Sequence, residues 1–103
     1  MDRNGYNTSI LQDKEECWVS KQTNCELHRH EVFYGTANRK LSKKYGLWVY
    51  LTPYWHNMSN NGVHNNKALD ARLKAEAQAK FEETHTRQEF IEIFGRNYIY
   101  EEK

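Results

Sequence analysis

Alternating side chains predict two strands in the first half of the chain. In "LHRHEVFY", residues 27–34, one side of the run would carry His28, His30 and two further residues. Side chains two residues apart on a strand share a face, so His28 and His30 would point the same way. The run "LWVYLTP", residues 47–53, is rich in β-branched and aromatic residues and ends at a proline. It gives the stronger strand prediction.

Irregular segments are predicted around these strands. Residues 1 to about 12 are polar and are expected to be loosely ordered. "CWVS", residues 17–20, fits either a strand or a knuckle-like turn. The polar stretch 35–46 lies between glycines and is predicted to be a loop, with room for a short helical turn at 39–45. The stretch 54–66, rich in glycine and asparagine, is predicted to be a second loop.

Helical patterns follow in the last third of the chain. From Lys67 to Phe81 good helix formers predominate, and the large apolar residues fall near one stripe. A shorter helix begins in "THTRQEF", where Thr86 and Glu89 have the spacing of a capping box, and Gly95 is placed to end it. The order strand, loop, strand, loop, helix, helix predicts an α+β fold.

Length, charge and cysteine content bear on the number of domains and on the expected cellular compartment. A length of 103 residues predicts a single domain, and a formal charge of +1 is too small for a protein whose whole surface binds nucleic acid. Two cysteines do not make a disulfide framework, which favours a reducing cytoplasm. No run approaches the roughly 18 apolar residues of a membrane span, and the N-terminus lacks a signal pattern. A cytoplasmic protein without a membrane partner is expected.

Histidines are the main candidates for chemistry. Four of the five lie in two pairs, His28 with His30 and His56 with His64. Imidazole is a frequent transition-metal ligand and a natural general base near neutral pH. If the two strands pair and the following loop returns to them, all four rings would meet. Exposed strand residues are the alternative for the first pair, and His85 fits a cap or surface position.

At this point the chain resembles a known family. The segments "LHRHEVFYGTANRKLSKKYGLWVYL", "HNMSNNGVHNNKALDARLKAEAQAKFEE" and "FGRNY" are similar to the HNH endonucleases, also called ββα-metal or His-Me finger proteins. The similarity is greatest to small phage and prophage members from low-GC bacteria. It implies one HNH-like domain over residues 1–103, with a ββα-metal core at 17–70 and a helical extension at 67–95.

The resemblance also implies roles for individual residues. His30 matches the general base that activates water, His28 matches a possible metal ligand or a residue that supports one, and His56 and His64 match metal ligands. The ion would be Mg²⁺, Mn²⁺, Ni²⁺ or Zn²⁺. Asn38 is the nearest candidate for the asparagine that orients the base. The basic cluster in the same segment is predicted either to contact the DNA backbone, which carries most of the affinity in such complexes, or to form a solvated loop: Arg39, Lys40, Lys43 and Lys44.

The chain departs from the family at its zinc knuckle. Where relatives have four ligands, this sequence has Cys17, Ser20, Thr52 and Trp55. Three of the four positions have lost a metal-binding side chain, so no structural zinc knuckle is expected. The tryptophans and neighbouring aromatic residues are predicted to fill that space as core.

Three functions are compatible with these features. The leading hypothesis is a phage-type endonuclease that hydrolyses DNA phosphodiester bonds with a divalent metal and a histidine base. The alternative is a catalytically inactive HNH-derived protein that binds and inhibits a host defence nuclease, such as a CRISPR nuclease, in the manner of an anti-CRISPR. A third hypothesis is a DNA-binding accessory factor without catalysis.

Overall fold

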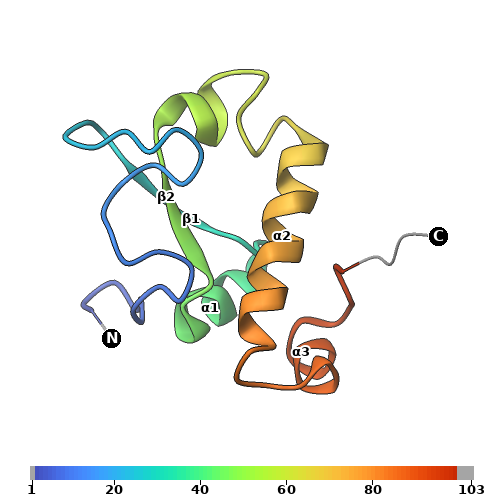
Figure 1. Ribbon diagram of the computed structural model, residues 1–103. Coiled ribbons are helices and arrows are strands. Elements are labelled where there is room, and N and C mark those ends of the chain that lie inside the picture. The colour runs from blue at the N-terminus through green and yellow to red at the C-terminus, as the bar shows by residue number, and fades with distance from the viewer. Residues whose placement is uncertain (1, 100–103) are drawn as a thin grey trace.

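The protein is a small α+β domain, and a computed structural model describes its residues 2–99. The α+β class predicted from the sequence is confirmed. Its elements follow one another along the chain as Figure 1 shows: β1 (His28–Glu31), α1 (Thr36–Tyr45), β2 (Trp48–Leu51), the π-helix η1 (Tyr54–Met58), α2 (Lys67–Phe81) and α3 (Arg87–Phe94).

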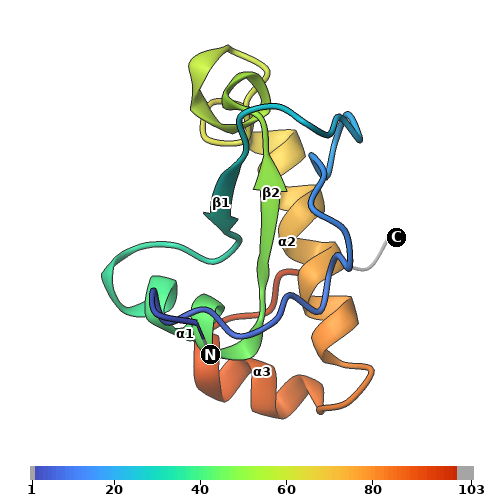
Figure 2. The same ribbon diagram turned by 90° about the vertical axis from the view of Figure 1, so that its left-hand side faces the viewer.

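The two predicted strands form an antiparallel hairpin. His28 pairs with Leu51 and His30 with Val49, so these side chains share one face, as the alternating pattern predicted. An isolated two-stranded sheet is barely stable in water, so the hairpin depends on the elements that cover it. Figures 1 and 2 show α2 running alongside it, with η1 at one end of the strands and α3 at the other.

A single core joins the hairpin to the helices. Val49 and Leu51 are fully buried. Leu73, Ala77 and Phe81 bring the apolar side of α2 to the same cluster. Further residues of this cluster come from segments far apart in the chain: Cys17, Val32, Phe33, Leu47, Val63, Phe90 and Phe94. Burial of this apolar surface is the main force that holds the helices against so small a sheet.

The connection between the strands is more helical than predicted. In place of a short turn, α1 occupies ten residues and ends at Gly46, whose φ of 71° is left-handed. Ser42 ties α1 to the end of β1, because its hydroxyl accepts a hydrogen bond from the Phe33 amide and donates one to the Phe33 carbonyl. A side chain at Gly46 would also collide with the carbonyl oxygen of Thr8.

The N-terminal segment has no helix or strand, yet it makes many specific contacts. The amide of Ile10 donates to the Gly46 carbonyl at 2.9 Å, and the indole of Trp48 donates to the Asn7 carbonyl at 2.8 Å. Arg29, on the outer face of the hairpin, pairs with Asp2 at 2.7 Å. The segment predicted to be loosely ordered thus covers the face of the hairpin opposite the histidines, where Figure 2 shows it crossing β2.

Local signals placed the last two helices correctly. The Asn66 side chain caps α2 by accepting from the amides of Ala68 and Leu69. Thr86 and Glu89 form the predicted capping box at the start of α3, and Gly95 ends that helix with a φ of 91°. Within residues 2–99, no helix combines the length and apolarity needed to cross a membrane.

At the positions of a zinc knuckle the chain has a hydrogen-bonded turn. Cys17 is fully buried in the core cluster, and its sulfur lies 4.0 Å from the Thr52 hydroxyl. The amide of Trp55 donates to that hydroxyl at 3.4 Å. The indoles of Trp18 and Trp55 pack against the same core. Aromatic packing and hydrogen bonds thus hold this region together.

Candidate metal centre

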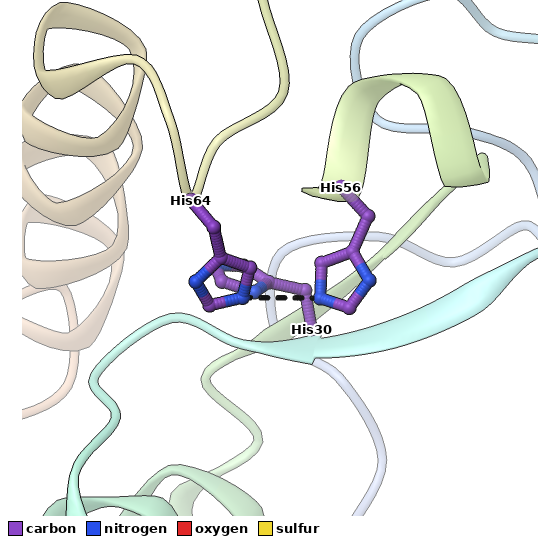
Figure 3. Close-up of side chains that lie close together, drawn as sticks. All are labelled: His30, His56 and His64. Atoms are coloured by element: carbon purple, nitrogen blue, oxygen red, sulfur yellow. Dashed lines mark hydrogen bonds between the residues drawn. The ribbon is translucent and has the colours of Figure 1, made fainter. Parts of the chain in front are cut away.

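Three imidazoles from three different segments meet at one end of the hairpin. His30 comes from β1, His56 from η1 and His64 from the loop that leads into α2. Figure 3 shows the three rings turned toward one another. One ring nitrogen from each lies within 4.8 Å of the others, which is close enough for a shared ion. The structure therefore brings together both halves of the histidine pattern seen in the sequence.

The loop closes onto η1 through its backbone, which explains why residues eight apart meet. The amide of Val63 donates to the Trp55 carbonyl at 2.7 Å, and the amide of His64 donates to the His56 carbonyl at 3.1 Å. Gly62 permits this approach, because a Cβ there would lie 2.9 Å from the His56 carbonyl oxygen. Both histidines are thus held by one compact turn.

The spacing between His56 and His64 suits a shared ion. Their Nε2 atoms lie 3.2 Å apart. Two nitrogens bound to a tetrahedral zinc, each about 2.0–2.1 Å from it, would be roughly 3.3 Å apart. The His30 ring completes the group, with its centroid 4.9 Å from that of His64 and 5.3 Å from that of His56.

Desolvation lowers the pKa of each of the three rings, which favours the neutral form that binds metal. His30 is only 2% exposed, and its Nε2 is buried without a hydrogen-bond partner. Burial, with the neighbouring positive charges, lowers the pKa of His30 to about 3. Burial also lowers the pKa of His56 to about 4. It lowers the pKa of His64 as well, where Asp70 partly opposes the effect.

His28, predicted as a ligand, lies outside this group. Its Nδ1 faces Nδ1 of His56 at 3.0 Å, and its Nε2 faces the Glu26 carboxylate at 3.1 Å. His56 meets His64 through its other nitrogen, Nε2. An ion between His56 and His64 would therefore lie on the far side of the His56 ring from His28. The structure groups His30, rather than His28, with the other two predicted ligands.

Asn38 makes no hydrogen bond with His30 in the described part of the chain. The residue is half-buried in α1, and His30 Nε2 has no hydrogen-bond partner among the described residues. Because α1 extends over the whole segment from Thr36, Asn38 belongs to a helix turn rather than to a loop that reaches the base. A catalytic role for Asn38 stays a prediction.

All four predicted DNA contacts lie on α1. Arg39 pairs with Glu31 of β1 at 3.3 Å, and its positive charge contributes to lowering the pKa of His64. Lys43 reaches the Asn4 carbonyl at 3.3 Å and the ring of Tyr6. Arg39, Lys40 and Lys43 line one cavity of about 420 Å³ on this helix. Three of the four basic residues thus share one surface of α1, and one of them, Arg39, is close enough to His64 to affect its pKa.

Sequence reasoning missed a polar cluster on the other side of the site. Lys74 pairs with Asp70 at 2.9 Å, and its ammonium lies 4.5 Å from the centre of the Tyr34 ring. Tyr34 in turn packs on His64, with ring centroids 5.0 Å apart. The i,i+4 spacing of Asp70 and Lys74 just after His64 was the available signal. It gave no hint that the pair faces the histidines.

Comparisons with known proteins add no further information on this site. No protein-family model matches the chain, and neither a curated protein nor a solved structure gives a match. A functional assignment therefore depends on the geometry of the residues themselves.

Proposed function

We propose that the protein is a metal-dependent endonuclease that hydrolyses DNA phosphodiester bonds at the group formed by His30, His56 and His64. The observation that supports this most directly is the convergence of three neutral imidazoles, with ligand atoms within 4.8 Å of one another. The sequence resemblance to HNH endonucleases points to the same chemistry. A divalent ion held there would supply Lewis acidity toward a phosphate oxygen.

The buried position of His30 favours a ligand role over the general-base role implied by the resemblance. A general base works best when its pKa lies near the working pH. His30 is almost fully buried, and its pKa of about 3 is far below that range. A metal ligand, in contrast, must be an unprotonated imidazole. The unpartnered Nε2 of His30 is then explained as an atom that faces an ion.

The ligand set narrows the choice of ion. Imidazole nitrogens bind Zn²⁺ and Ni²⁺ more strongly than Mn²⁺, whereas Mg²⁺ prefers oxygen ligands. Three nitrogens also leave further coordination positions for water and substrate, as a catalytic site requires. We therefore expect Zn²⁺ or Ni²⁺ to bind most tightly.

Basic residues beside the site support a polyanionic substrate. The charge of Arg39 acts on His64, and Lys40, Lys43 and Lys44 lie on the same helix, α1. A DNA strand laid along this helix would bring its phosphates past the ion. Such contacts give affinity that falls steeply with salt and carry little sequence information.

The test is cleavage of supercoiled plasmid by the purified full chain. With Zn²⁺, Ni²⁺, Mn²⁺ or Mg²⁺ present we expect nicked circles, and a chelator should prevent them. His30→Ala and His56→Leu should abolish nicking. His85→Leu is the matched control, because His85 stacks on Phe81 away from the site. Absence of nicking with all four metals would contradict the proposal.

A non-catalytic binding function is the second candidate. It is favoured by the exposure of Tyr54 and Met58 on η1, at 48% and 74%. Exposed aromatic residues often anchor protein interfaces. A stable complex with a host defence nuclease that survives His30→Ala, without plasmid nicking, would support this function instead.

A further inference from the structure

His56 is held at both edges of its ring. Its Nε2 faces His64 at 3.2 Å, and its Nδ1 faces Nδ1 of His28 at 3.0 Å. His28 continues the chain of contacts, with its Nε2 3.1 Å from an oxygen of Glu26. A carboxylate, an imidazole and a candidate metal ligand are thus connected in series.

The number of ring protons decides which nitrogen donates and which accepts at each contact of this series. A neutral imidazole carries one ring proton, and a nitrogen that binds a metal carries none. If His56 binds the ion through Nε2, its proton is on Nδ1 and is donated to His28. His28 then accepts at Nδ1 and carries its own proton on Nε2. That proton faces Glu26, whose carboxylate can only accept.

The arrangement also separates His28 from the ligands. The two nitrogens of one imidazole point in different directions, so a single ion cannot lie against both. The ring of His28 meets that of His56 edge to face, with centroids 5.1 Å apart. His28 can therefore hold the Nδ1 edge of His56 while an ion occupies the opposite edge.

From this geometry we infer that His28 is a positioning residue, which together with Glu26 fixes the orientation and tautomer of His56 for divalent-metal binding. The inference rests on the proposed metal centre. Histidine ligands commonly donate their second N–H to a carboxylate, carbonyl or water, and loss of that partner lowers metal affinity about 10- to 100-fold. Here an imidazole stands between ligand and carboxylate. The His28 side chain is 33% exposed and that of Glu26 74%, so His28 should contribute more.

Two variants of nearly equal size test the inference in the full chain. His28→Asn places an acceptor oxygen near the position of Nδ1, whereas His28→Leu has no acceptor. Zinc affinity is measured by competition with a chromophoric chelator, and the visible spectrum of bound Co²⁺ reports coordination. We expect His28→Leu to weaken zinc binding about 10- to 100-fold, and His28→Asn to restore most of that loss. His85→Leu, remote from the centre, should bind as the unmodified chain does.

The outcomes distinguish this inference from the proposed function. If the unmodified chain binds no metal, the proposed centre fails and the inference falls with it. If the unmodified chain binds metal and His28→Leu binds equally well, the inference alone is wrong. Equal losses in the Asn and Leu variants would also overturn it, because the imidazole itself would then be the ligand.

A measurement on the unmodified chain guards against a variant that does not fold. Nitrogen NMR of the zinc-loaded protein identifies which ring nitrogen of each histidine carries the proton. The inference requires His28 to be protonated on Nε2 and to accept at Nδ1. A proton on Nδ1 of His28 would overturn it.

Discussion

Two clusters of rings lie at opposite ends of the hairpin, and their spacing is nearly the same. In the phenylalanine cluster, Phe90 lies 5.2 Å from Phe33 and 4.7 Å from Phe94 between ring centroids. In the histidine cluster the corresponding distances run from 4.8 to 5.3 Å. The difference is chemical. The carbon atoms of a phenylalanine ring need only van der Waals contact, whereas a buried imidazole nitrogen needs a hydrogen bond or an ion.

This contrast assigns different roles to the two ends. The phenylalanine cluster packs Phe33, from the segment after β1, against α3, and Phe90 also contacts Phe81 of α2, so its rings stabilise the fold. The histidine cluster leaves His30 Nε2 buried and unpartnered, so its rings reduce stability until something binds there. The clusters should therefore respond differently to truncation, to metal and to acid.

Truncation within the phenylalanine cluster should have the largest effect. Phe90→Ala removes a fully buried ring and leaves a cavity, which should lower the free energy of unfolding by about 3–5 kcal/mol. Urea denaturation measures this change. His64→Ala, which truncates an exposed ring, should change it by less than about 0.5 kcal/mol without metal. Equal losses of unfolding free energy in Phe90→Ala and His64→Ala would show that the two clusters contribute equally to stability.

Metal should stabilise the protein only through the histidine cluster. With free Zn²⁺ at about 100 times its Kd, the free energy of unfolding should rise by about 2.7 kcal/mol. His56→Leu should eliminate this rise, and His85→Leu should preserve it. Thermal melts with zinc and with a chelator make the comparison. A zinc effect that persists in His56→Leu would place the ion elsewhere.

Acid should weaken the fold through His30. The pKa of His30 is about 3 in the fold, while histidine in an unfolded chain titrates near about 6.5. Between these values the unfolded state binds more protons. The free energy of unfolding should therefore fall as pH drops below about 6.5, with His30 contributing up to about 1.4 kcal/mol per pH unit.

The measurement is urea denaturation from about pH 7.5 to about pH 4.5 with a chelator present, a range that spans the unfolded-state titration of histidine. His30→Leu removes the titrating group, so its unfolding free energy should depend less steeply on pH over this range. Identical slopes for the variant and the unmodified chain would show that His30 is protonated as readily in the fold as in the unfolded state.

Loss of the α3 cap should have a smaller effect than truncation of the core and should leave metal binding unchanged. Thr86→Ala removes the half of the capping box in which the Thr86 hydroxyl accepts from the Glu89 amide, and should cost about 1 kcal/mol. Because α3 carries Phe90 and Phe94, this change loosens the phenylalanine cluster alone. Zinc affinity should stay unchanged, and chelator competition checks this. A parallel loss of zinc affinity would mean that the two clusters are coupled.

Elements with strong local signals were predictable from the sequence. The hairpin strands follow from alternation and β-branched residues, and α3 follows from Thr86, Glu89 and Gly95. The segment 36–45 was underestimated because most of its residues are polar. Only the packing of Leu41, Ser42 and Tyr45 against other segments reveals which side of that helix faces inward.

The grouping of the histidines was only partly predictable. Alternation placed His28 and His30 on one face, which the strand register confirms. Residues two apart on a strand are separated by roughly 6.5–7 Å, so both cannot contact one nitrogen of the same neighbour. Which of them joins His64 depends on where η1 places His56. That position is set by backbone contacts of Gly62, and no local pattern encodes them.

Gly62 couples the position of His56, in η1, to that of His64, in the following loop. Because Gly62 has no side chain, the turn packs closely against η1 and holds His56 and His64 together. His30 lies on a different element, β1. A methyl group at position 62 would push the turn away from the His56 carbonyl. The proposed metal centre thus depends on the absence of a side chain at Gly62.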